Sequence, residues 1–217
     1  STVRGGKEYE FDSIEDAIQD MQAGKFVVVV DNEDRENEGD LIIAGEHLTP
    51  EKAAFMIRYT SGMICVACEG EICDRLELPP MVEKNTESLR TAYTVSCDYN
   101  IGTTTGISAA DRSATTRALA DPSTLASALS RPGHVFPLRY TPGGVLKRVG
   151  HTEAAVDLCK LAGLRPAGAL CEVALDDGTM ARRPDLEIFA RRWGLKLITI
   201  SDIIKYRVRK GLVDEGF

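Results

Sequence analysis

The feature that most constrains the fold is a set of apolar runs that no polar residue interrupts. Residues 26–30 read FVVVV and residues 41–44 read LIIA. Strands of this kind are buried on both faces, as in a sheet that carries helices on each side. Helix signals alternate with strand signals along the chain, which has no internal repeat and no long linker. We therefore expect a single three-layer α/β (α+β) domain over residues 1–217, with helices on both faces of the sheet.

Helix and strand signals alternate along the rest of the chain. Ser13 and Asp16 form a capping-box-like start for an apolar stripe that Gly24 ends. We expect further helices to begin at Thr49-Pro50, Ser108, Thr152, Pro184 and Ser201. Further strands are expected in MICVAC (63–68), AYTVSC (92–97), AGALCEVAL (167–175) and LKLITI (195–200), with loops in LPPMVEKNTESLR (78–90) and RPGHVFPLR (131–139).

The composition argues against several classes of protein. The formal net charge is −7, so the clustered Lys and Arg that bind nucleic acid or an anionic membrane are missing. No stretch approaches the roughly 20 apolar residues of a membrane span. The first residues lack the apolar core of a signal peptide, and six Cys without such a signal predict reduced thiols. We expect a cytoplasmic protein with no nucleic-acid or membrane partner.

Cys65 and Cys68 have the spacing of a metal-binding or redox pair. They lie in an apolar run that is predicted to be a strand, where residues three apart point to opposite faces. We therefore interpret them as buried structural thiols.

The densest charge of the chain, DNEDRENEGD (31–40), lies between two apolar strands. Most charge runs are solvated loops, but neighbouring carboxylates repel by about 0.6 kcal/mol per pair even in water. On an extended backbone Glu36, Glu38 and Asp40 would lie on one side, where hard oxygen ligands suit Mg²⁺ or Mn²⁺. We expect a cation or polar-substrate site there and a solvated loop over residues 31–34. An EF-hand fails, because Gly45 stands where a bidentate Glu is required.

A second group of signals lies in the other half of the chain. Thr152 is expected to cap a helix whose free N–H groups, with Arg148 nearby, could bind phosphate. The simpler interpretation is that Thr152 only caps the helix, but this leaves Arg148 and His151 unexplained. GTTTGISAADR (102–112) is a weaker anion-site signal. Glu172 lies within an apolar strand, where burial would raise its pKa toward acid/base use. These residues point to a divalent-metal enzyme that acts on a small phosphorylated substrate.

Five motifs carry a resemblance to a known family. They are DRENEGDLIIAGE (34–46), TTGISAADR (104–112), RPGHVFPL (131–138), GHTEAAVDL (150–158) and AGALCEV (167–173). In this order, and over nearly the whole chain, the sequence resembles the 3,4-dihydroxy-2-butanone 4-phosphate synthases of riboflavin biosynthesis. The resemblance implies a mixed sheet and a lyase that converts D-ribulose 5-phosphate to L-3,4-dihydroxy-2-butanone 4-phosphate and formate. It also implies a Mg²⁺ requirement and a homodimer with active sites shared between subunits. Mn²⁺ is expected to substitute, because imidazole is a softer ligand than Mg²⁺ prefers.

The resemblance also assigns residues. It implies Glu36 and His151 as metal ligands, and His134, Glu172 and Asp40 as catalytic residues. The substrate would contact Arg35, Glu36, Glu38, Asp40, Thr105, Arg148, Gly150, His151, Thr152 and Glu172. Val149 stands where many members have Gly. The chain lacks the zinc-binding region of the GTP cyclohydrolase II that is fused to many relatives, so we expect the monofunctional form.

Two other functions remain open from the residues alone. Another metal-dependent sugar-phosphate isomerase or aldolase would also begin with enolisation. A nucleotide- or RNA-binding module of related architecture would need a basic groove with interleaved aromatics, whereas this chain is acidic and only 6% aromatic.

Overall fold

The structure is a computed structural model that describes residues 9–217. Its strands are β1 Val27–Val30, β2 Gly39–Ala44, β3 Cys65–Cys68, β4 Cys97–Tyr99, β5 Leu129–Arg139, β6 Ala167–Glu172 and β7 Lys196–Thr199. Its α-helices are α1 Ile14–Gln22, α2 Pro50–Tyr59, α3 Gly70–Arg75, α4 Ala109–Ala120, α5 His151–Leu161, α6 Arg183–Trp193 and α7 Ile200–Arg209. Short 3₁₀ turns occupy Gly45–His47, Ala126–Ala128 and Gly144–Leu146.

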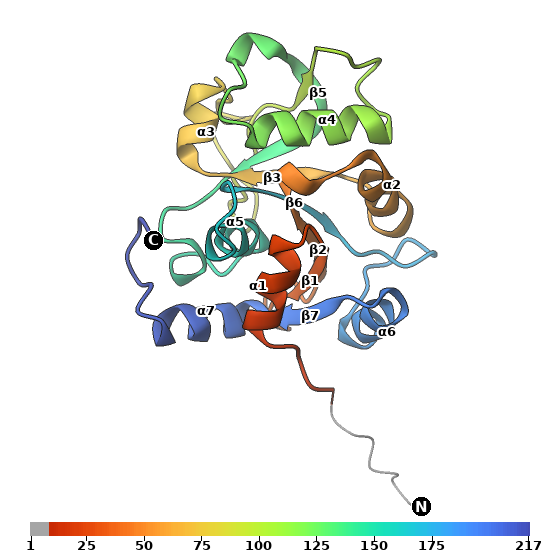
Figure 1. Ribbon diagram of the computed structural model, residues 1–217, viewed down its shortest axis with the longest axis vertical. Helices are drawn as coiled ribbons and strands as arrows, with labels where there is room; N and C mark the ends of the chain where they lie inside the picture. The colour runs from red at the N-terminus through yellow and green to blue at the C-terminus, as the bar shows by residue number, and fades with distance from the viewer. Residues whose placement is uncertain (1–8) are drawn as a thin grey trace, which may run out of the picture.

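The strands form one mixed sheet in the order β4-β5-β3-β6-β2-β1-β7 (Figure 1). The pairs β1–β7 and β3–β5 are parallel. The pairs β1–β2, β2–β6, β3–β6 and β4–β5 are antiparallel. This arrangement confirms the expected mixed α/β sheet.

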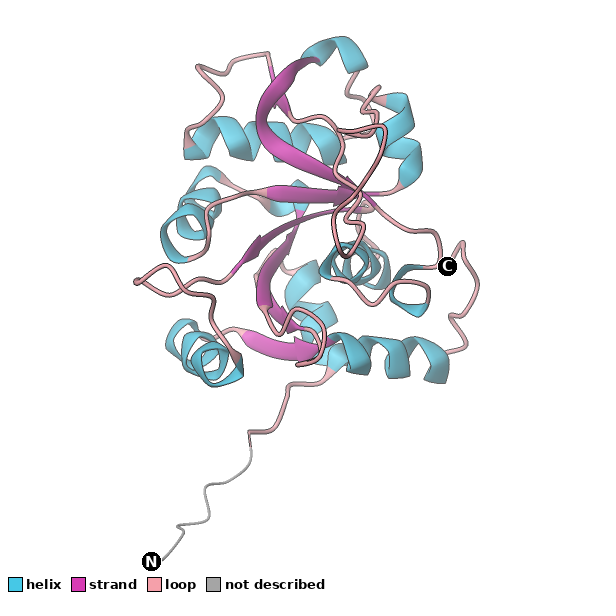
Figure 2. Ribbon diagram, turned by 180° about the vertical axis from the view of Figure 1, so that it is seen from behind, coloured by secondary structure: helices cyan, strands magenta, loops and turns pink. Residues whose placement is uncertain are grey.

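Helices cover both faces of the sheet, as Figure 2 shows. One face packs against α2, α3, α4 and α6, and the other against α1, α5 and α7. The FVVVV run explains the layering directly: Val28 and Val30 belong to the first core, whereas Val27 and Val29 belong to the second. Cys65 and Cys68 likewise lie in opposite cores and are buried free thiols, which confirms that the two sulfurs diverge.

Several boundaries differ from the sequence-based expectation. The segment RPGHVFPLR, expected to be a loop, lies in β5, and α3 was not expected. Of AYTVSC only Cys97 belongs to a named strand, while Tyr93 and Thr94 form isolated bridges. The last helix begins at Ile200 with Thr199 as its cap. Thr152 does not cap α5, because Gly150 occupies that position and the helix begins at His151.

Candidate active site

A small polar cavity of about 80 Å³ lies where β2 and β6 meet the N-terminus of α5. Six of the residues that the sequence assigned to the site line it: Glu36, Asp40, Arg148, His151, Thr152 and Glu172. The remaining lining residues, which sequence reasoning had not placed there, are Cys65, Thr91, Tyr93, Leu138 and Leu170. An open depression of about 480 Å³ beside α3 is larger, but no side chain that lines it has a buried polar atom without a hydrogen-bond partner.

The register of the sheet creates the acidic wall of the cavity. Asp40 lies directly opposite Glu172 in the β2–β6 ladder. Asp40 is only 2% exposed, and its Oδ1 atom has no hydrogen-bond partner. A buried polar atom without a partner is costly and calls for a functional explanation. The carboxyl of Glu172 accepts a hydrogen bond from the Ser61 hydroxyl at 3.0 Å.

His151 faces this wall from the first position of α5. Its Nδ1 atom lies 4.0 Å from Glu36 Oε2 and 3.9 Å from Asp40 Oδ1. Its Nε2 atom lies 3.2 Å from the carbonyl oxygen of Val29, which can only accept, so Nε2 carries the hydrogen. The lone pair of Nδ1 therefore points toward the carboxylates. Together with the orphaned Asp40 oxygen, these donors fit a divalent cation.

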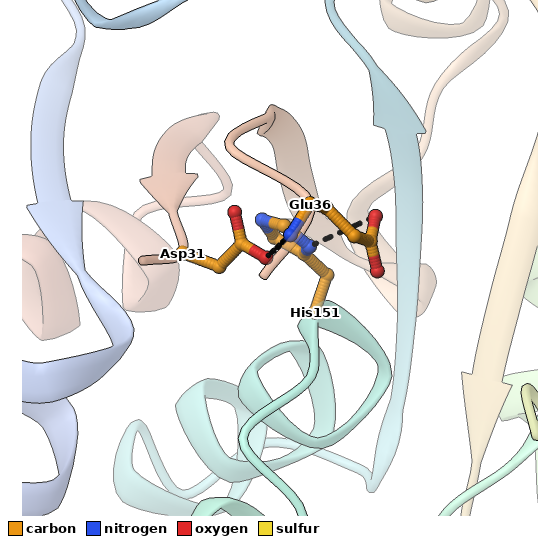
Figure 3. A group of neighbouring side chains, drawn as sticks. All are labelled: Asp31, Glu36 and His151. Atoms are coloured by element: carbon orange, nitrogen blue, oxygen red, sulfur yellow. Dashed lines mark hydrogen bonds and ion pairs between the residues drawn. The ribbon is translucent and has the colours of Figure 1, made fainter. Parts of the chain in front are cut away.

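Asp31 is a further potential donor, and the sequence interpretation of it as a solvated residue is wrong. One atom each of Asp31, Glu36 and His151 lies within 4.8 Å of the others (Figure 3). The Asp31 side chain is only 1% exposed. It accepts hydrogen bonds from the backbone N–H groups of Glu36 at 3.0 Å and Glu38 at 3.1 Å. Asp31 thus shapes the acidic loop from inside, whereas Glu33 and Asp34 are exposed as expected.

The acidic loop is not extended, contrary to expectation. Residues 33–36 form turns, and Asn37 has a positive φ of 53°. Glu36 consequently points into the polar cavity, while Glu38 lines a neighbouring depression with Asp31 and Arg183. The tight turn separates side chains that an extended strand would have aligned.

Burial shifts the pKa values of the cavity residues. Burial raises the pKa of Asp40 well above its usual range, and the charges of Glu172, Glu36 and Glu38 add to the rise. Burial also raises the pKa of Glu172 and of Glu38. For His151 burial lowers the pKa, so the neutral imidazole is favoured. A bound cation would relieve the repulsion among these carboxylates.

Two arginines approach the N-terminus of α5 beside the acidic wall. A Cβ atom on Gly150 would lie 2.4 Å from Arg148 Nη1 and 3.1 Å from Arg35 Nη2, so only glycine leaves both guanidinium groups in place. The buried Glu153 carboxylate accepts from Arg148 Nη1 at 2.7 Å and holds this side chain. Helix N-terminal N–H groups and two guanidinium groups form a suitable anion site.

Five of the expected residues do not line the cavity of their own chain: Arg35, Glu38, Gly150, His134 and Thr105. Arg35 and Gly150 lie beside it at the start of α5, and Glu38 lines the neighbouring depression, whereas His134 and Thr105 lie on other elements. His134 lies on β5, two positions from β6 in the sheet, and its side chain is 41% exposed. Thr105 is exposed in the loop before α4. Neither residue lines the cavity.

Comparison with known proteins identifies the family. A sequence model described as 3,4-dihydroxy-2-butanone 4-phosphate synthase matches residues 15–206. The chain belongs to the 3,4-dihydroxy-2-butanone 4-phosphate synthase family. A 3,4-dihydroxy-2-butanone 4-phosphate synthase of Agrobacterium fabrum is 60% identical over 193 residues, which are 89% of this chain and 91% of that protein.

Longer relatives and solved structures agree with this membership. A riboflavin biosynthesis protein RibBA of Nocardia farcinica is 61% identical over 91% of this chain and 48% of its own length, so the chain spans about half of that relative. A crystal structure of a 3,4-dihydroxy-2-butanone 4-phosphate synthase in complex with two magnesium ions superimposes with a TM-score of 0.88 and 48% identity, covering 90% of this chain and 96% of the other. The described part of this synthase-family chain contains no helix that is long and apolar enough to cross a membrane.

Proposed function

We propose that this chain converts D-ribulose 5-phosphate to L-3,4-dihydroxy-2-butanone 4-phosphate and formate, as a lyase of riboflavin biosynthesis. One observation carries the proposal: an orphaned, buried Asp40 oxygen faces Glu36 and His151 directly beside an anion site at the start of α5. The substrate has the matching polarity, with oxygen atoms for a cation at one end and a phosphate at the other.

Glu36 and His151 are the proposed protein ligands of Mg²⁺, and Mn²⁺ is expected to substitute because an imidazole belongs to the set. When bound, the ion supplies Lewis-acid polarisation of the substrate oxygens. His151 is preorganised for this role, because its contact with the Val29 carbonyl leaves Nδ1 free. Asp31 holds the backbone of Glu36 at the required place.

Asp40 and Glu172 are the proposed acid/base groups. Enolisation and the later steps require protons to be taken from and returned to carbon and oxygen atoms of one substrate. Burial raises the pKa of both carboxyl groups toward the range where they can hold and release a proton. Glu38 and Arg35, which lie next to the cavity rather than in its lining, are also proposed to contact the substrate.

The phosphate is proposed to bind at the start of α5, to Arg148, Arg35 and the backbone of Gly150 and Thr152. The phosphate takes no part in the proton transfers, so this site contributes orientation rather than chemistry. The Glu153 carboxylate pairs with the Arg148 guanidinium group and holds it beside the proposed phosphate position.

We also propose a homodimer in which His134 and Thr105 act in the cavity of the second subunit. Both are exposed and lie outside the cavity of their own chain. Co-refolding inactive His134→Ala and Glu172→Gln subunits would test this arrangement. Random pairing of equal amounts makes about half of the dimers mixed, and each mixed dimer has one intact site of two, so the mixture should recover about a quarter of the wild-type activity. Zero recovery from well-folded mixed dimers would overturn the shared site.

The free thiols of the chain are consistent with action in the cytoplasm.

The reaction itself is tested by incubating the protein with ribulose 5-phosphate and Mg²⁺ and measuring formate by NMR. We expect formate to be produced. EDTA should abolish its production, and added Mg²⁺ or Mn²⁺ should restore it. Isomerised pentose phosphate without formate would instead indicate a sugar-phosphate isomerase. Glu36→Gln should weaken metal binding, whereas Glu172→Gln should retain metal binding and lose turnover. Equal loss of metal affinity in both variants would contradict this division of roles.

A further inference from the structure

Outside the cavity, the described residues contain one more paired acid and imidazole. Asp98, in β4, accepts a hydrogen bond from the backbone N–H of His134 through Oδ1 at 2.7 Å. Its Oδ2 atom lies 2.8 Å from His134 Nδ1. The Asp98 side chain is 14% exposed. One carboxylate therefore fixes both the backbone and the ring of the same histidine.

The two contacts determine the tautomer of His134. An ionised carboxylate can only accept hydrogen bonds, so the ring nitrogen that faces it carries the hydrogen. Nδ1 is therefore the protonated nitrogen, and Nε2 keeps a free lone pair. His151 has the opposite tautomer, because its Nε2 donates to Val29.

The backbone around the pair is built for this close approach. The β4–β5 ladder shifts between Cys97 and Asp98, so that Cys97 pairs with Val135 but Asp98 pairs with Ser130. Such irregularities re-aim side chains next to functional sites. A Cβ atom on Gly133 would lie 2.1 Å from the carbonyl carbon of Cys97.

A second glycine comes from the loop before α4. A Cβ atom on Gly106 would lie 2.2 Å from Asp98 Oδ2 and 2.7 Å from His134 Nδ1, and the φ of Gly106 is +101°. Asp111 holds this loop by accepting hydrogen bonds from the backbone N–H groups of Thr104 and Gly106. The motifs TTGISAADR and RPGHVFPL, which are separate in the sequence, thus meet at one carboxylate.

We propose that Asp98 is a positioning residue that holds His134 in the Nδ1–H tautomer, so that Nε2 accepts a proton from the substrate. This inference rests on the catalytic role proposed for His134. The proton moves from a substrate C–H or O–H group to Nε2, and the Asp98 carboxylate balances the charge of the resulting imidazolium. A later step returns the proton and restores the neutral ring.

Long-range ¹H–¹⁵N NMR of ¹⁵N-histidine-labelled protein in alkaline buffer tests the tautomer without any variant. We expect Nδ1–H for His134 and Nε2–H for His151, so the two residues serve as internal contrasts. A wild-type His134 protonated on Nε2 would overturn the inference.

Asp98→Asn is the sharpest variant. The backbone N–H of His134 can only donate, so the oxygen of the substituted amide side chain must stay next to it as the acceptor. The amide NH₂ group then faces Nδ1 of the ring. The ring must then adopt the Nε2–H tautomer and lose its free acceptor. We expect this NMR switch together with a fall in kcat of about 10²–10⁴-fold, at nearly unchanged KM and unchanged Mn²⁺ affinity.

Three controls separate this inference from the proposed function. Asp74→Asn changes an exposed carboxylate that pairs with Arg139 and should keep wild-type activity and the wild-type tautomer. The double variant Asp98→Asn/His134→Ala should be no slower than His134→Ala alone. Full activity in His134→Ala would overturn the proposed role of His134 itself. An inactive His134→Ala beside a fully active Asp98→Asn would overturn only the positioning role of Asp98.

Discussion

Asp40 of β2 lies directly opposite Glu172 of β6, and Asp40 Oδ1 has no hydrogen-bond partner. Two carboxyl groups in adjacent positions of one ladder destabilise a sheet when both are ionised. The other residues of both strands are buried and keep these groups in place. The ladder register thus keeps two mutually repelling carboxyl groups side by side where a cation and a substrate are proposed to bind.

Asp40→Asn should stabilise the metal-free protein at about pH 8. Because burial raises the folded-state pKa of Asp40, its contribution to stability is present below the ordinary pKa of about 3.9 and is lost as pH rises. Asparagine avoids that loss, so its advantage should shrink toward about pH 4. Each kcal/mol by which the variant raises the free energy of unfolding corresponds to a rise in Tm of about 2–4 °C, measured in EDTA. A variant that is less stable than wild type at about pH 8 would contradict this account.

Asp31→Ala should disturb the metal site without removing a proposed ligand. It deletes the acceptor of the Glu36 and Glu38 backbone N–H groups, and we expect Mn²⁺ affinity to fall about 10–100-fold. Asp34→Ala is the matched control, because Asp34 is exposed in the same loop and should change stability by less than about 0.5 kcal/mol. Calorimetric titration measures both affinities, and similar values for the two variants would refute the role of Asp31.

Glu87 should make the loop over residues 85–91 sensitive to acid. Its carboxylate accepts from the backbone N–H groups of Thr91 and Leu89, and these bonds lower its pKa to about 2. A depressed folded-state pKa gives stability that is present above the ordinary value of about 4.3 and is lost as pH falls toward about 2. The protection of the Leu89 and Thr91 amides, which is the intrinsic exchange rate at each pH divided by the measured rate, should fall over that range.

The variant Glu87→Gln should show the faster amide exchange already at neutral pH. Arg148 donates to the Leu89 carbonyl, so we also expect the KM for the phosphorylated substrate to rise in this variant. Glu83→Gln, an exposed change in the same segment, should alter neither property. Unchanged exchange in Glu87→Gln would show that the carboxylate does not order the loop.

Arg207→Met should be strongly destabilising. Arg207 and Asp157 are both fully buried and lie 2.9 Å apart, and removal of one partner leaves an uncompensated buried charge that costs about 3–5 kcal/mol. The double variant with Asp157→Asn should lose less than Arg207→Met alone. The exposed pair Arg209–Glu15 provides the contrast, with a loss of about 0–1 kcal/mol for Arg209→Ala. Urea unfolding measures all three, and a small loss for Arg207→Met would contradict the assigned burial cost.

Local signals in the sequence were accurate wherever neighbouring residues decide the structure. Ser13 caps α1 as expected, and the buried residues of this helix are those of the predicted apolar stripe. The FVVVV run became a strand buried on both faces, because its four valines divide between two cores. Local signals failed for RPGHVFPLR, which reads as a loop but pairs with β3 and β4, since long-range pairing outweighs the turn preference of Pro and Gly.

The candidate site shows the same division. By itself the sequence determined the layered fold, the acidic run and, through family resemblance, most of the residues that line the cavity. Only the tertiary structure decided that Asp31 is an interior scaffold, that Asp40 faces Glu172, and that Asp98 holds His134. The reason is physical: hydrophobic period and capping act over a few residues, whereas burial and ladder register depend on which distant strands become neighbours.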